Sequence, residues 1–116
     1  MNYTGEERPW GNFLNLYEED GFKVKRIEVK PGEMLSLQLH HHRSEHWICV
    51  RGEGIVTLGD RKIVLRENEH VFIPRMTKHR AENRNSVPFV FVEVQVGDYL
   101  GEDDIVRFED KYGRIE

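Results

Sequence analysis

The sequence predicts an all-β domain built as a sandwich or small barrel, and a double-sheet jelly roll fits best. No stretch keeps apolar residues at the 3.6-residue spacing of an amphipathic helix. Instead, short runs rich in β-branched and aromatic residues recur, and turn-forming Gly, Pro, Asn and Asp residues separate them. Short strands at regular spacing are typical of such folds. The predicted strands span residues 13–17, 22–29, 34–41, 46–51, 54–58, 62–65, 70–73, 79–83 and 89–96.

Turn-forming residues mark the ends of these strands in chain order. Asp20-Gly21 separates the first two strands, and Lys30-Pro31-Gly32 ends the second. The later turns also contain Gly, Asn or Asp, and they lie at residues 51–54, 59–60, 67–69 and 83–85. The acidic stretch that begins at Gly101 belongs to a C-terminal arm, residues 97–116, in which one helical turn fits.

Alternation assigns two faces to the strand at 34–41, because successive side chains of a strand point to opposite sides. The leucines share one face and the polar residues share the other. The two sets are Leu35, Leu37 and Leu39 on one side, and Ser36, Gln38 and His40 on the other.

The strand at 89–96 is divided in the same way. Its valines share one face, and its aromatic and polar residues share the other, namely Phe89, Phe91, Glu93 and Gln95. This pattern suits a barrel with a polar site inside and a covered exterior. Since a large exposed apolar patch is uncommon on a monomer, we expect the leucine and valine stripes to be covered in a homodimer.

Length and composition exclude several classes of protein. The 116 residues suffice for one domain, residues 1–116, and the single cysteine excludes an internal disulfide. No apolar run approaches the roughly 20 residues of a membrane helix, and the first residues do not form a signal peptide. We therefore expect a cytoplasmic protein without a membrane partner. The net charge of -4, from 17 Lys+Arg and 21 Asp+Glu, argues against nucleic-acid binding.

The histidines predict a metal site. Four of the six fall within residues 40–46. Gln38 and His40 share a strand face, Glu45 opens the next strand, and His79 begins a later one. One amide oxygen, two imidazoles and one carboxylate suit a divalent ion, zinc first, with Co, Mn, Ni or Fe as alternatives. The other interpretation is a hydrogen-bonded polar core without metal.

Two motifs that contain these residues resemble those of the cupin family. The first spans 32–52 and reads Gly32-x5-Gln38-x-His40-x4-Glu45-x6-Gly52, with Gln38 where most cupins have histidine. The second spans 74–83 and reads Pro74-x-Met76-x2-His79-x3-Asn83, with Met76 where the family has glycine. Glycine there would permit a positive φ that methionine resists. The resemblance implies a double-stranded β-helix, which is a jelly-roll barrel.

Longer stretches narrow the resemblance to the type II mannose-6-phosphate isomerase cupin. They include Arg8-Pro9-Trp10-Gly11, the His-rich segment 40–47 and the segment 99–107, and the resemblance extends over residues 8–114. In that family this cupin commonly forms the C-terminal domain of bifunctional mannose-1-phosphate guanylyltransferases. The resemblance therefore implies an isomerase domain that stands alone, with a separate guanylyltransferase chain as a candidate partner.

The activity implied by the resemblance is interconversion of mannose 6-phosphate and fructose 6-phosphate, which feeds nucleotide-sugar and polysaccharide synthesis. Moving a proton between C1 and C2 through an enediolate requires a base and positive charge beside the oxygens. The candidate bases are a hydroxide on the metal, His42 and Glu93. The candidate cations for the phosphate or the enediolate are Arg43, Lys78 and Arg80.

Two other functions fit the same residues. His40, Glu45 and His79 alone form the two-histidine, one-carboxylate set of a non-haem iron dioxygenase. A cupin that binds a sugar phosphate without catalysis, or for regulation, is the second alternative. Oxygen uptake and hexose-phosphate turnover distinguish these functions from the isomerase.

Overall fold

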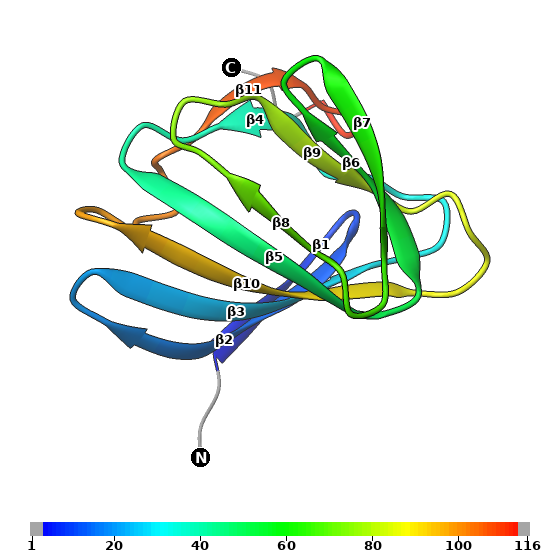
Figure 1. Ribbon diagram of the computed structural model, residues 1–116, viewed down its shortest axis with the longest axis horizontal. Helices are drawn as coiled ribbons and strands as arrows, with labels where there is room; N and C mark the ends of the chain where they lie inside the picture. Colours follow the sequence, from blue (N-terminus) through cyan, green and yellow to red (C-terminus); the bar gives the residue numbers. More distant parts are fainter. Residues whose placement is uncertain (1–3, 114–116) are drawn as a thin grey trace.

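The computed structural model describes residues 4–113, and they form two antiparallel β-sheets that face each other (Figure 1). In sheet order, the six-stranded sheet contains β1 (Thr4–Arg8), β2 (Gly11–Glu19), β3 (Phe22–Val29), β10 (Phe89–Gly97), β5 (Arg43–Arg51) and β8 (His70–Ile73). The five-stranded sheet contains β11 (Val106–Glu109), β4 (Leu37–Leu39), β9 (His79–Glu82), β6 (Glu53–Leu58) and β7 (Arg61–Arg66). The all-β prediction is confirmed, and each predicted strand overlaps an observed one.

Two edge strands, β1 and β11, were not predicted. β1 pairs with β2 through the turn at Trp10, whose side chain is buried in the core. β11 pairs with β4 and replaces the helical turn expected in the C-terminal arm, of which residues 114–116 lie outside the described residues. Among residues 4–113, no helix has the length and hydrophobicity needed to cross a bilayer.

The inner face of the six-stranded sheet changes from apolar to polar along β10. Phe91 lies opposite Ile27 of β3 and Cys49 of β5, and all three are buried in the core. The next two inward positions of β10, Glu93 and Gln95, are also buried. Their cross-strand partners are Lys25 and Trp47 for Glu93, and Lys23 and Glu45 for Gln95. The apolar rows form the core, and the polar rows form one end of the space between the sheets.

One residue departs from the predicted apolar stripes. Leu35 packs against the core cluster, because regular pairing in β4 begins only at Leu37. The expectation that Leu35 faces outward with the other leucines is therefore wrong. Val90 is 2% exposed but lies outside the core cluster, and its partner on β3 is Glu28, so it keeps the side of β10 opposite to Phe89 and Phe91.

The motif turns require left-handed backbone. Gly52 has a φ of +72°, and a Cβ there would lie 2.3 Å from the carbonyl oxygen of Pro88, so only glycine fits. Met76 also has a positive φ, of 65°, although it carries a side chain. The turn at which the resemblance implies glycine is thus formed here by a strained methionine. The backbone N–H of Met76 donates to the carbonyl of His40 at 2.9 Å.

Candidate metal centre

Polar side chains from both sheets line one cavity at the polar end of the space between them. The sheets contribute to it from opposite sides, with β5 and β10 on one side and β4 and β9 on the other. All four sequence-predicted metal ligands line this cavity, together with two of the predicted catalytic residues. These six residues are Gln38, His40, Arg43, Glu45, His79 and Glu93.

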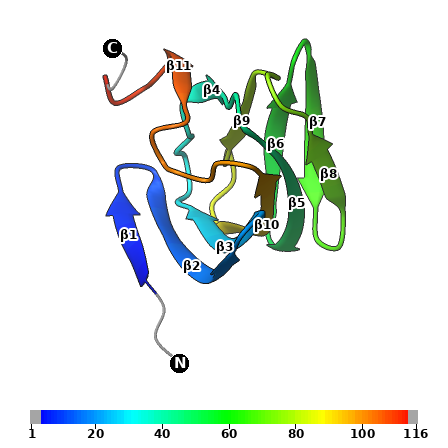
Figure 2. The same cartoon turned by 90° about the vertical axis from the view of Figure 1, so that its left-hand side faces the viewer.

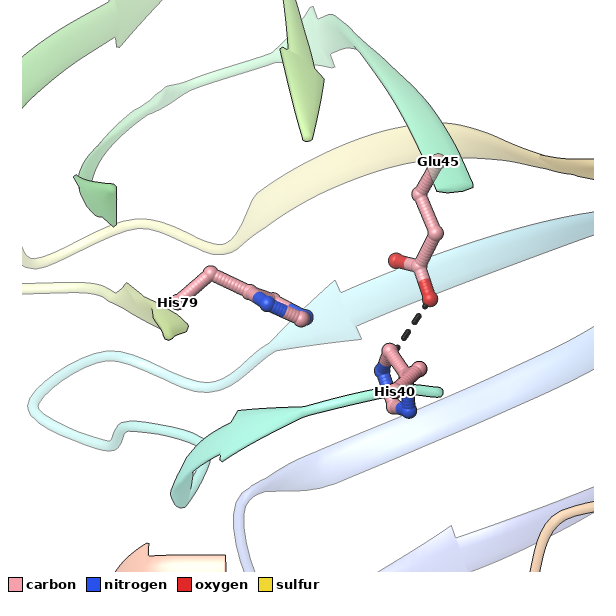
Figure 3. A group of neighbouring side chains, drawn as sticks. All are labelled: His40, Glu45 and His79. Carbon is pink, nitrogen blue, oxygen red and sulfur yellow. Dashed lines mark ion pairs between the residues drawn. The ribbon is translucent and has the colours of Figure 1, made fainter. Parts of the chain in front are cut away.

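His40, Glu45 and His79 form a compact and buried group (Figure 3). His40 follows β4, Glu45 lies on β5, and His79 begins β9. One potential ligand atom from each residue lies within 4.8 Å of the others, and the His40 Nε2 atom is 3.2 Å from Glu45 Oε2. Three segments that are distant in sequence therefore bring together the donor set of a divalent metal ion.

Backbone carbonyls orient both imidazole rings. The Nδ1 atom of His40 lies 2.6 Å from the carbonyl oxygen of Asp104, and Nδ1 of His79 lies 2.8 Å from that of Thr77. Because a carbonyl oxygen only accepts, each Nδ1 carries the hydrogen and each Nε2 keeps its lone pair. Metal-binding histidines are held in this way by outer hydrogen bonds, so the tautomers fit the proposed ligand role.

Burial and neighbouring charges give the three residues the protonation states that a metal requires. Burial lowers the pKa of His40 to about 4, although the Glu45 carboxylate opposes this shift. Burial likewise lowers the pKa of His79. Burial alone would raise the pKa of Glu45, but Arg43 and the two histidines lower it well below its usual range. Near neutral pH the imidazoles are therefore neutral and the carboxylate is ionised.

Arg43 is the buried cation next to this group. Its Nε donates to Glu45 Oε2 at 2.8 Å, and its Nη2 donates to His40 Nε2 at 3.2 Å. Its Nη1 is buried and has no hydrogen-bond partner among the described residues. The indole N–H of Trp47 donates to the other Glu45 oxygen at 2.8 Å. Arg43 thus has one N–H donor available within the cavity. Trp47 belongs to the core cluster and also holds the Glu45 carboxylate.

Gln38 and Glu93 complete the predicted residues that face the cavity. The Gln38 amide nitrogen donates to the carbonyl and the hydroxyl oxygens of Ser36, each at 3.3 Å. Glu93 accepts a hydrogen bond from Gln95 at 2.5 Å. Burial and the nearby Glu45 carboxylate raise the pKa of Glu93. Glu45 and Glu93 therefore differ near neutral pH, because Glu45 is ionised and Glu93 favours its protonated form.

The structure does not bring His42, Lys78 and Arg80 into the cavity. His42 is half exposed in the turn before β5, with Nδ1 3.8 Å from an Asp98 carboxylate oxygen. The Lys78 ammonium lies over the Phe108 ring, 4.2 Å from its centroid. Arg80 donates to the Leu35 carbonyl at 3.0 Å and contacts β11. These three residues lie close to the predicted ligands in sequence, but none of them lines the cavity.

Several cavity residues were not singled out from the sequence. Lys25 is buried on β3, and its ammonium contacts the Glu102 carboxylate. Arg8 and Arg107 also line the cavity. Lys25 had a usable signal, since it shares one strand face with Ile27 and Val29, and both of these are buried. Asp104 and Glu102 had none, because their contacts depend on a long connection between the sheets.

Comparisons with known proteins agree with this geometry. A model of the family described as mannose-6-phosphate isomerase, C-terminal, matches residues 2–110. The chain belongs to this family. The xanthan biosynthesis protein XanB of Xanthomonas campestris pv. campestris (strain B100) is 55% identical over 107 residues, which is 92% of this chain and 23% of XanB. The alginate biosynthesis protein AlgA of Pseudomonas aeruginosa PAO1 is 50% identical over 114 residues, 98% of this chain and 24% of AlgA.

A third relative is the mannose-1-phosphate guanylyltransferase ManC of Salmonella typhimurium LT2. It is 49% identical over 108 residues, which is 93% of this chain and 22% of ManC. The chain thus spans about a quarter of the length of these relatives. A Klebsiella pneumoniae protein with a double-stranded β-helix domain superposes with a TM-score of 0.72 at 22% identity, covering 83% of this chain and 82% of that one. Oxalate decarboxylase of Lactobacillus farciminis gives a TM-score of 0.79 at 18% identity over 91% of this chain and 33% of that one. The cupin fold, a double-stranded β-helix, is confirmed.

Proposed function

We propose that this chain is a metal-dependent aldose–ketose isomerase that interconverts mannose 6-phosphate and fructose 6-phosphate. The observation that carries the proposal is the meeting of two neutral imidazoles, one ionised carboxylate and the Arg43 guanidinium in a single cavity. Membership of a family described as mannose-6-phosphate isomerase, C-terminal, supports the same reaction.

The ligands of the proposed metal are His40, Glu45 and His79, with Gln38 as a fourth or weaker one. Two imidazoles and one carboxylate suit zinc best, and Co, Mn, Ni and Fe are the alternatives. When bound, the ion supplies Lewis-acid polarisation of the sugar carbonyl. The carbonyls of Asp104 and Thr77 hold the two rings in the ligand tautomer.

The chain's own residues supply the remaining chemistry of the proposal. Arg43 faces the cavity with an available N–H, and its guanidinium neutralises a negative charge of the substrate, on the phosphate or on the developing enediolate. Glu93 is the carboxyl group that holds or releases the proton moved between C1 and C2, since it is the candidate protein base that lines the cavity. The buried aromatic core behind Glu93 keeps bulk water away from the intermediate.

The relatives suggest where the product is used. Two of them are named for xanthan and alginate biosynthesis, and a third is a mannose-1-phosphate guanylyltransferase. We place this chain in polysaccharide synthesis on that basis. A guanylyltransferase is the proposed partner enzyme, because the relatives are about four times as long as the segment they share with this chain.

A coupled isomerase assay tests the proposed function. The purified chain is stripped with a chelator, and turnover of each hexose phosphate is measured before and after Zn²⁺, Co²⁺ or Mn²⁺ is returned. We expect turnover only with metal, and loss of both metal and turnover in His79→Ala. His70→Ala is the matched control, because His70 is exposed on β8. Turnover that is absent under every metal condition would refute the isomerase.

One observation favours a second function, binding of a sugar phosphate without catalysis. Arg43 donates to His40 Nε2 and Glu45 Oε2, two of the atoms that would hold the ion. Since Nε2 has one lone pair, the guanidinium and a metal cannot both use it. A chain that binds hexose phosphate but takes up no metal under the add-back conditions would have this second function.

A further inference from the structure

Lys25 is a buried cation that the proposed reaction does not use. It lies on the inner face of β3 and is only 3% exposed. Its ammonium contacts the Glu102 carboxylate and stands 4.3 Å from the centroid of the Phe13 ring. A buried ammonium needs an anion or acceptors beside it, and Glu102 is the anion that contacts Lys25 in the ligand-free protein.

Glu102 reaches Lys25 from the connection between the two sheets, residues 98–105, which runs from β10 to β11 (Figure 2). The two partners differ in exposure, because the Lys25 side chain is 4% exposed and the Glu102 side chain 48%. Glu102 thus lines the cavity and remains in contact with water, whereas the Lys25 side chain is enclosed.

Several cations face the Glu102 carboxylate. Burial raises its pKa, but Lys25 beside it, with Arg43 and Lys23 further away, lowers the pKa overall. Arg43 adds a second observation, since its Nη1 is buried in the same cavity and has no hydrogen-bond partner among the described residues. The Glu102 carboxylate thus compensates the charges of two buried cations, Lys25 and Arg43, and the Nη1 donor of Arg43 still has no acceptor among the described residues.

We propose that Glu102 occupies an anion subsite, from which the phosphate of the sugar phosphate displaces it to bind Lys25 and Arg43. The proposal rests on the proposed function for the nature of the substrate, and it adds the place of the phosphate. A phosphate monoester carries roughly -1.5 to -2 charge near neutral pH and three acceptor oxygens, so it satisfies two cations better than one carboxylate does. Glu102 then acts as an internal competitor that leaves when substrate arrives.

Calorimetric titration of the metal-free chain with a hexitol 6-phosphate tests the subsite. This probe has no carbonyl group, so it cannot be isomerised, and the unphosphorylated hexitol and inorganic phosphate serve as comparison ligands. We expect the hexitol phosphate to bind and the hexitol not to bind. Glu102→Gln should tighten binding of the hexitol phosphate and of phosphate roughly tenfold, and Lys25→Met should weaken both at least about tenfold.

Asp103→Asn is the matched control, because it removes the same charge one residue away and Asp103 contacts Tyr99 instead of Lys25. The affinity of the Asp103→Asn variant for the hexitol phosphate should stay within about twofold of that of the unchanged chain, since only a distant charge is lost. Equal tightening in both variants would assign the effect to net charge and overturn the proposal. Unchanged or weaker binding in Glu102→Gln would overturn it as well, even if Lys25→Met fails to fold.

The two proposals can fail separately. Tighter phosphate binding in Glu102→Gln, in a chain with no isomerase turnover, keeps the subsite and refutes the isomerase. An active isomerase whose Glu102→Gln variant binds the hexitol phosphate no better keeps the function and refutes the subsite.

Discussion

At the scale of single residues, Asp104 holds the His-rich turn in place. Its carboxylate oxygens accept the backbone N–H groups of His41 and His42, each at 2.9 Å, and its carbonyl accepts from His40 Nδ1. Asp104 is 6% exposed, so these bonds are shielded from water. The ligand ring and the turn that carries it are therefore both fixed by one residue of the 98–105 connection.

Replacing Asp104 by Ala should weaken metal binding. The backbone carbonyl remains, but the turn loses the carboxylate that holds two N–H groups, so the His40 ring is no longer held in the ligand orientation. Loss of such an outer contact typically costs about 10–100-fold in affinity. Competition with a chromophoric chelator measures the change, and Asp103→Ala is the control. Equal metal affinity in Asp104→Ala and the unchanged chain would contradict this role.

Met76→Gly should stabilise the chain. A non-glycine residue in the left-handed region costs roughly 1–2 kcal/mol, and Met76 has a φ of 65° with a side chain that is 56% exposed, so little packing is lost. The greater conformational entropy of glycine in the unfolded chain offsets part of this gain, so the free energy of unfolding should rise by about 0.5–1 kcal/mol. Urea unfolding gives the free energy.

The matched control for this change is Asn68→Gly at a φ of 71°, where we expect a smaller gain because asparagine tolerates this region. A Met76→Gly variant that is no more stable than the unchanged chain would show that the methionine side chain compensates for its backbone strain.

At the scale of elements, the five-stranded sheet is weakest around β4, which has three residues. Arg80 on β9 compensates for this. Its Nε donates to the carbonyl of Leu35 just before β4, and its Nη atoms reach the Glu109 carboxylate and carbonyl on β11, each at 3.3 Å. One side chain therefore connects β9, the start of β4 and β11.

Arg80→Met should lower stability by about 1–2 kcal/mol, because it removes a charged and partly buried hydrogen bond while keeping the length of the side chain. Since Arg80 points away from the cavity, the affinity for a sugar phosphate should not change. Thermal unfolding and calorimetry measure the two effects on the same sample. Normal stability combined with weak ligand binding would instead assign Arg80 to substrate recognition, as its sequence position suggests.

The sequence predicts those elements and site residues whose signal is local. Alternation within one strand is sufficient to place Gln38, His40 and Glu93 inward, because a strand has a fixed period of two. β1 is a polar edge strand and β11 is an edge strand of only four residues, and their pairing with β2 and β4 is a tertiary effect that neither segment specifies by itself. The Lys25–Glu102 pair joins residues 77 positions apart, so only the fold brings it together.

At the scale of the whole molecule, the polar cavity and an apolar surface lie on opposite faces of the same sheet. His46 of β5 pairs with Phe72 of β8 and with Val94 of β10, and Val94 in turn pairs with Val24 of β3. These residues point away from the cavity. With Ile48 they form the outer apolar face, on which Phe72 is 47% exposed and Ile48 42%.

We predict that the outer apolar face pairs with its copy in a homodimer. A face that crosses four neighbouring strands is wider than the scattered apolar residues of a monomer surface, and a two-fold axis through it lets each copy cover the other. Light scattering should give twice the chain mass at micromolar concentration, and Phe72→Glu should yield a folded monomer. Val64→Glu, at a residue 44% exposed on β7 of the other sheet, should leave the dimer intact. A monomeric mass for the unchanged chain would contradict the pairing. Equal dissociation in Phe72→Glu and Val64→Glu would contradict it too, because a general gain of negative charge would then explain the Phe72→Glu result.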